Sequence, residues 1–109
     1  MSKNRQPAMK RYAIDHPYCE VCEFLGIENV PAVDVHHIKA RSALGNEDPR
    51  NLISLGRFYH DCAEGNIKGI KASECNEHLL KIKRGEYEET TKAWFAKAFQ
   101  RRHGAGGML

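Results

Sequence analysis

The chain lacks long apolar runs, internal repeats and a strong excess of charge, and each absence excludes a class of protein. No apolar run approaches the roughly 20 residues that a membrane-spanning helix needs, and the mean hydropathy is −0.61. We therefore expect no membrane partner. Lysine and arginine number 17 against 14 aspartate and glutamate, which gives a formal net charge of +3. This mildly basic balance permits nucleic acid as a partner but does not demand it.

No linker divides the 109 residues, so we expect one domain with a modest core. Residues 1–7 are charged and residues 104–109 are rich in glycine, and we expect both ends to be flexible. The first residues also lack the apolar segment of a secretory signal, so we expect a cytoplasmic location. In that compartment cysteines are more often reduced thiols or metal ligands than disulfides.

The apolar pattern predicts a small α+β fold. Residues 32–36 alternate and include β-branched side chains, and residues 52–55 form a second short apolar run, so both are expected to be strands. The polar stretch between them holds turn residues, which predicts an antiparallel hairpin with a long connection. Helices are expected over residues 8–14, 57–64, 72–83 and 87–101.

Three of the six histidines, His36, His37 and His60, fall on this predicted hairpin and the helix after it. Hydrolysis of a phosphodiester needs a base for water and a cation for the developing charge, and imidazole can act as the base or bind the cation. Neighbouring side chains of a strand point to opposite faces. His36 and His37 can therefore share a site only if the strand ends there, and the loop residues from Lys39 onward favour that ending.

Asn51 lies where the loop meets the second predicted strand. Its amide could bond the loop backbone opposite and so fix the direction of His37. A histidine pair alone is more often a surface feature, and Asn-Leu alone carries no information. The order of strand, loop, strand and helix around all these residues favours a site.

This combination resembles the HNH endonuclease family, whose core is the ββα-metal fold; the resemblance covers residues 19–60. It implies a nuclease that nicks or cuts DNA with Mg²⁺, Mn²⁺ or a transition ion. It also implies that His36 and His60 bind the ion, that His37 is the general base, and that Asn51 orients the loop of that base. Family members of this size are common among phage and prophage proteins.

The cysteines depart from the family pattern. The Cys-x-x-Cys of residues 19–22 is a half-site for zinc, and in many HNH proteins a second pair flanks the last histidine. Gly56 and Tyr59 occupy those positions here. Cys62 and Cys75 could complete a structural zinc site, or they could be ordinary buried residues. The four candidate zinc ligands are Cys19, Cys22, Cys62 and Cys75.

Other interpretations use the same residues. A DNA-binding zinc finger would use Cys19, Cys22 and two histidines, but adjacent histidines do not fit the finger spacing. A catalytically idle DNA-binding module of the same fold, or a zinc-structured interaction domain, is also possible. The intact histidine pair favours an enzyme over an idle module.

Basic residues border the predicted site. Lys39, Arg41 and Arg50 belong to the loop, and Arg57 begins the next helix. They could bind backbone phosphates of DNA, which adds affinity without sequence information, or they could be solvated loop charges. The aromatic residues of the last helix share one face and are expected in the core.

Overall fold

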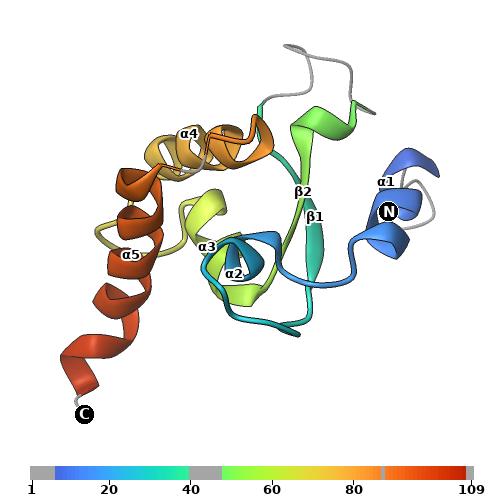
Figure 1. Ribbon diagram of the computed structural model, residues 1–109. Helices are drawn as coiled ribbons and strands as arrows, with labels where there is room; N and C mark the ends of the chain where they lie inside the picture. Colours follow the sequence, from blue (N-terminus) through green and yellow to red (C-terminus); the bar gives the residue numbers. More distant parts are fainter. Residues whose placement is uncertain (1–6, 40–47, 87, 108–109) are drawn as a thin grey trace.

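The computed structural model describes residues 7–39, 48–86 and 88–107, with side chains up to residue 100. It is an α+β fold in which helices surround a two-stranded antiparallel hairpin (Figure 1), and this confirms the predicted fold class. In chain order the elements are α1 Pro7–Asp15, α2 Glu20–Phe24, β1 Asp34–His37, the 3-10 turn η2 Pro49–Asn51, β2 Leu52–Leu55, α3 Arg57–Glu64, α4 Ala72–Lys83 and α5 Glu89–Gly107.

The register of the hairpin assigns its side chains to two faces. Asp34 pairs with Leu55, and His37 pairs with Leu52. Because side chains alternate along a strand and paired residues share a face, Asp34 and His36 lie on one face and Val35 and His37 on the other. All four residues of β2 are buried, because both faces of the hairpin are covered.

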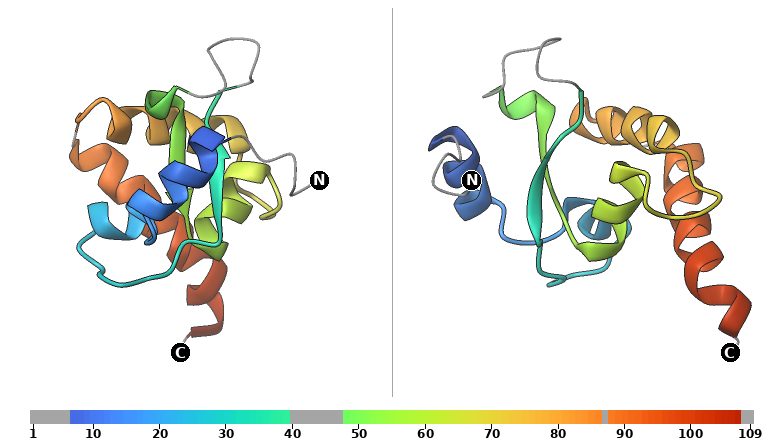
Figure 2. Two further views of the ribbon diagram at one scale, coloured as in Figure 1. Left: turned by 90° about the vertical axis from the view of Figure 1, so that its right-hand side faces the viewer. Right: turned by 180° about the vertical axis from the view of Figure 1, so that it is seen from behind.

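The two faces are covered by different helices. On one side α1 packs against both strands through a small cluster of Tyr12, Val35 and Leu52. On the other side a larger core joins the hairpin to α2, α3, α4 and α5. Figures 1 and 2 show α1 on one side of the hairpin and α3, α4 and α5 on the opposite side. α5 enters this core through the fully buried Phe95, whose carbonyl accepts a hydrogen bond of 3.1 Å from the Tyr59 hydroxyl.

The predicted helices at 57–64 and 72–83 are confirmed to the residue, and the first strand is shifted. β2 has four residues, so only residues 34–37 of the first strand pair with it, which include 34–36 of the predicted 32–36 segment and add His37. α5 is longer than expected and includes residues 104–107, which were expected to be flexible. Once a helix is nucleated, each added residue gains a hydrogen bond for the two dihedral angles it fixes. Pro7, which was also expected to be flexible, begins α1. The rest of the predicted flexible ends, residues 1–6 and 108–109, lies outside the described residues.

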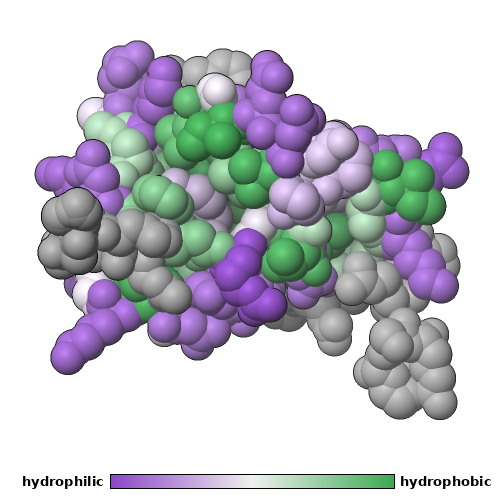
Figure 3. Space-filling view, turned by 90° about the horizontal axis from the view of Figure 1, so that it is seen from below, coloured by the Kyte–Doolittle hydropathy of each residue, from purple (hydrophilic) through white to green (hydrophobic). Residues whose placement is uncertain are grey.

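Several large apolar side chains are exposed at the surface. Ile14, Ile27, Val33 and Phe99 are among the large apolar side chains that solvent reaches. Seen from below, hydrophobic patches alternate with hydrophilic side chains (Figure 3). In the part of the chain that the structure describes, no helix has the length and apolarity to cross a bilayer.

Candidate metal centre

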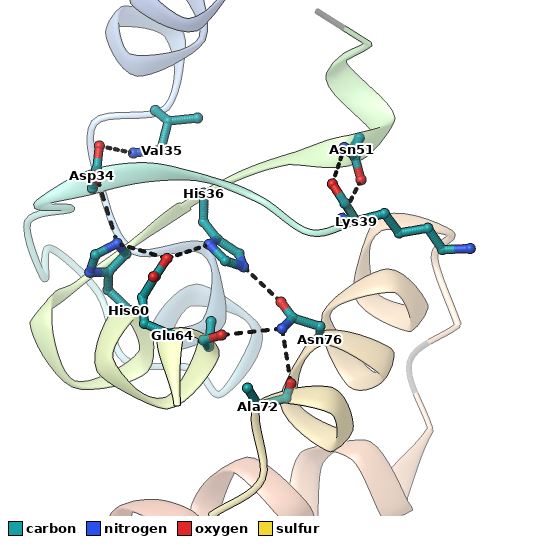
Figure 4. A network of polar contacts seen from close by, with 10 residues as sticks. Asp34, Val35, His36, Lys39, Asn51, His60, Glu64, Ala72 and Asn76 are labelled. Carbon is teal, nitrogen blue, oxygen red and sulfur yellow. Dashed lines mark hydrogen bonds and ion pairs between the residues drawn. The ribbon is translucent and has the colours of Figure 1, made fainter. Parts of the chain in front are cut away.

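The hairpin and α3 bring His36 and His60 together. His36 is buried on the face of β1 that α3 covers, and His60 lies one turn into α3. Their ring centroids are 6.2 Å apart and the rings are nearly perpendicular. The sequence predicted this pair, and Figure 4 shows the two rings on either side of a third side chain, Glu64.

Glu64 provides the third donor. It lies four residues after His60, so both side chains project from one face of α3. Its Oε2 atom lies 3.3 Å from Nδ1 of His36 and 3.7 Å from Nε2 of His60. The three donor atoms all lie within 4.8 Å of one another. Since an ion about 2.1 Å from each donor holds two donors at most about 4.2 Å apart, small side-chain rotations complete the set. These residues could hold a metal ion.

Asp34 extends the polar cluster along β1. Its Oδ2 lies 3.5 Å from Nε2 of His60, while its Oδ1 accepts a hydrogen bond of 2.8 Å from the Val35 N–H. Asp34 shares the face of His36 because the two are two residues apart on the strand. The cluster therefore has two carboxylates and two imidazoles, a donor set that suits a divalent cation.

The two ring nitrogens of His36 face different groups. Nε2 lies 2.7 Å from Oδ1 of Asn76 on α4, and Nδ1 faces Glu64 (Figure 4). Burial lowers the pKa of His36, although Asn76 and Glu64 oppose the shift. The ring is therefore neutral near pH 7, which is the form that binds metal.

Asn51 holds the loop that follows β1. Its side chain is fully buried. Oδ1 accepts a hydrogen bond of 2.8 Å from the Lys39 N–H, and Nδ2 donates one of 3.2 Å to the Lys39 carbonyl. The predicted bond between this amide and the loop backbone is therefore present. Its effect on His37, two residues before Lys39, stays a prediction.

His37 is not placed beside the metal cluster by the hairpin register. It is the last residue of β1, it is half-buried, and it shares the face of Val35 and Leu52. The strand does end at His37, as expected, but the ring belongs to the α1 side of the hairpin. The metal cluster and the expected base therefore lie on the two faces of one strand end.

The four cysteines are free, buried thiols of one core. Cys19 caps α2, and its Sγ accepts a hydrogen bond of 3.4 Å from the Cys22 N–H. The Cys22 side chain lowers the pKa of Cys19 to about 6, with help from backbone N–H groups and against the effect of burial. Burial raises the pKa of Tyr59, and all four cysteines add to that rise.

Three metal donors converge at one place among the described residues, and that place is the histidine cluster rather than the cysteines. Gly56 packs against Cys19, where an added Cβ would lie 3.4 Å from the Cys19 Cβ. Tyr59, at the second position where the HNH pattern would have a cysteine, is almost completely buried. A structural zinc on Cys62, Cys75 and the Cys-x-x-Cys pair stays a prediction.

The predicted phosphate-binding residues have different surroundings. Lys39 and Arg50 line a cavity of about 330 Å³, with Asp48, Leu80, Lys83 and Arg84. Arg50 is exposed and forms a two-bond ion pair with Asp48. Arg57 is exposed at the start of α3, and Arg41 lies outside the described residues. A larger cavity of about 660 Å³ is lined by Glu20, Glu23, Phe24, Ile82, Lys83, Glu89 and Lys92. Its three carboxylates make it less suited to phosphate.

Sequence reasoning missed Glu64, Asp34 and Asn76. Glu64 carried a signal, because a carboxylate four residues after a histidine ligand on a helix points the same way. Asp34 carried a weaker one, its two-residue spacing from His36. Asn76 carried none, since it is 40 residues from His36 and meets it only through the packing of α4 on α3.

No protein-family model, curated protein or solved structure matches this chain. A function for this chain can therefore be proposed only from the geometry of the candidate metal site and from its surroundings.

Proposed function

We propose that this protein is a metal-dependent endonuclease of the HNH type that hydrolyses phosphodiester bonds of DNA. The observation that carries the proposal is the convergence of His36, His60 and Glu64 where β1 meets α3. The sequence motif alone supplied two of these ligands. The third supports the proposal because it was not used to recognise the motif.

The donor set favours particular ions. Two imidazoles and one carboxylate suit Zn²⁺, Ni²⁺, Co²⁺ or Mn²⁺ better than Mg²⁺, which prefers oxygen ligands and keeps its waters. When bound, the ion would neutralise charge on the phosphate and stabilise the leaving oxygen. His36 is buried and Glu64 is about half exposed, so solvent and substrate could reach a bound ion from the side of Glu64.

His37 is the proposed general base, and the edge of β1 explains how it can act. In the described residues β1 pairs only with β2, so its other edge carries no strand. A phosphodiester lying across that edge could meet the metal cluster on one face and His37 on the other. His37 would take a proton from the attacking water, and Asn51 would hold the loop that sets its direction.

The cavity beside Asn51 supports a nucleic-acid substrate. Among the described residues, its lining has four basic side chains, Lys39, Arg50, Lys83 and Arg84, and one carboxylate, Asp48. Two of them are ion-paired within the protein, Arg50 with Asp48 and Arg84 with Glu86. Backbone phosphates would bind there without sequence information. Lys83, the last residue of α4, and Arg84, which caps it, were not in the predicted set.

The test is a nicking assay on supercoiled plasmid with a panel of divalent ions. We expect nicking that needs an ion, is lost in His37→Ala and falls strongly in Glu64→Gln. Glu77→Gln is the control, because Glu77 is exposed on α4 and outside the cluster. Nicking that persists in His37→Ala and Glu64→Gln would contradict the proposal.

The alternatives give other results in the same samples. Ion and DNA binding without nicking would identify an idle DNA-binding module. Tightly bound zinc without DNA binding or nicking would identify a zinc-structured interaction domain. Either result would overturn the proposal that this protein is an enzyme.

A further inference from the structure

We propose that Asn76 of α4 is a positioning residue for the metal centre. It holds His36 in the tautomer that carries its proton on Nε2, and so directs the lone pair of Nδ1 toward the cation position between Glu64 and His60. This inference rests on the proposed metal centre, but the tautomer can be measured without any metal.

The neighbours of Asn76 decide which way its amide points. Nδ2 donates hydrogen bonds of 2.9 Å to the Ala72 carbonyl and 3.2 Å to the Ala63 carbonyl. Carbonyl oxygens only accept, so both must face the NH₂ group. Oδ1 is thereby directed at Nε2 of His36, 2.7 Å away. An oxygen acceptor there requires a proton on Nε2, because a neutral imidazole has one N–H and one lone pair.

The opposite tautomer would be disfavoured. With the proton on Nδ1, the lone pair of Nε2 would face Oδ1 of Asn76, and turning the amide over would set Oδ1 against two carbonyls. Glu64 does not impose a similar constraint, because its side chain is 46 % exposed and can turn toward water. Asn76, whose amide is fixed by its hydrogen bonds, therefore decides the tautomer of His36. Glu64 can change its conformation to suit either tautomer.

The same amide also holds the end of α3. The last carbonyls of a helix have no partner within the helix. Backbone N–H groups beyond α3 donate hydrogen bonds to the carbonyls of Asp61 and Cys62. Nδ2 of Asn76 donates one to the carbonyl of Ala63, the residue before Glu64. One side chain thus connects the strand that carries one ligand with the helix that carries the other two. Groups outside the ligand shell that orient a metal-binding histidine are worth roughly 10- to 100-fold in metal affinity.

The tautomer is read from ¹H–¹⁵N correlation spectra of the imidazole nitrogens in the metal-free protein above pH 7.5. We expect Nε2–H for His36 in the wild type. Asn76→Leu should move the population toward Nδ1–H, which can then donate to Glu64. Asn76→Asp keeps an acceptor for Nε2–H but loses both donors, so it should retain the tautomer while lowering the melting temperature. A wild type that is mainly Nδ1–H would overturn the inference.

Metal affinity is the second readout, measured with Zn²⁺ by calorimetry. We expect Asn76→Leu to bind roughly 10- to 100-fold more weakly than the wild type, and Asn76→Asp to lose much less. Glu77→Leu is the matched control, because it adds the same side chain at the next, exposed position of α4. Equal affinity of Asn76→Leu and wild type would refute the positioning role. A wild type that binds no ion would instead refute the metal centre, whatever the tautomer.

Discussion

Removing the amide of Asn51 tests how the loop after β1 is held. In Asn51→Ala two hydrogen bonds to the Lys39 backbone are lost, of 2.8 and 3.2 Å, from a fully buried side chain. Each such bond contributes about 0.5–1.5 kcal/mol net, so we expect a loss of about 2 kcal/mol in the free energy of unfolding. For a domain of this size that is a fall of roughly 10 °C in the melting temperature.

The assay combines stability with rate. Urea unfolding followed by the emission of Trp94, the single tryptophan, gives the free energy. Nicking at saturating DNA gives the rate of the folded fraction. We expect the rate to fall more than the DNA affinity, because His37 lies two residues before the released Lys39. Asn66→Ala is the control at an exposed asparagine, where we expect a change within about 0.5 kcal/mol.

Two results would refute this reasoning separately. Unchanged stability in Asn51→Ala would mean that the two hydrogen bonds contribute nothing net. A stability loss with an unchanged rate would mean that Asn51 supports the fold but does not orient His37. Asn51→Asp helps to separate the two roles of Asn51. It keeps the acceptor for the Lys39 N–H but loses the donor to the Lys39 carbonyl.

Three further predictions concern other parts of the molecule. Cys19→Ser should lower the zinc content and the melting temperature if a structural zinc is present. If both stay unchanged, the structural zinc on the cysteines is refuted. Burial, with Lys81, lowers the pKa of His78, whose ring stacks on Trp94. Neutral His78 therefore contributes its full stabilisation above the pKa of the unfolded state, about 6.5, and this contribution is lost as the pH falls toward the lower pKa of the folded state. Urea titrations from pH 8 to pH 5 should show this loss, and His78→Phe should flatten it. Lys39→Ala should weaken DNA binding alike for all sequences and reduce the salt slope by about 1.

The fold could be predicted from the sequence because its elements depend on local patterns. The 72–83 helix was predicted from its apolar positions and the 57–64 helix from the break that Gly56 makes before it, and both are found at those bounds. The end of β1 was harder, because the length of its partner strand decides it. The end of α5 was also missed, since glycines weaken a helix without forbidding its continuation.

The cluster that could hold a metal ion was predictable from the sequence only in part. His36 and His60 were identified from a motif, and Glu64 was within reach of helical periodicity. Asn76 was out of reach, because no local pattern relates a residue of α4 to a ring on β1 40 positions earlier. The alternation rule predicted that His37 points to the opposite face from His36, and the register of the hairpin agrees.

The contribution of α4 bears on how small a working version of this protein could be made. A fragment ending at Gly65 would contain every residue by which the motif is recognised, yet Asn76 would be missing and the carbonyl of Ala63 would lose its donor. Grafting the hairpin and α3 onto another scaffold would meet the same difficulty. A shortened version of this chain that keeps the candidate metal site should therefore retain the sequence through Lys83, or supply an equivalent amide from the new host.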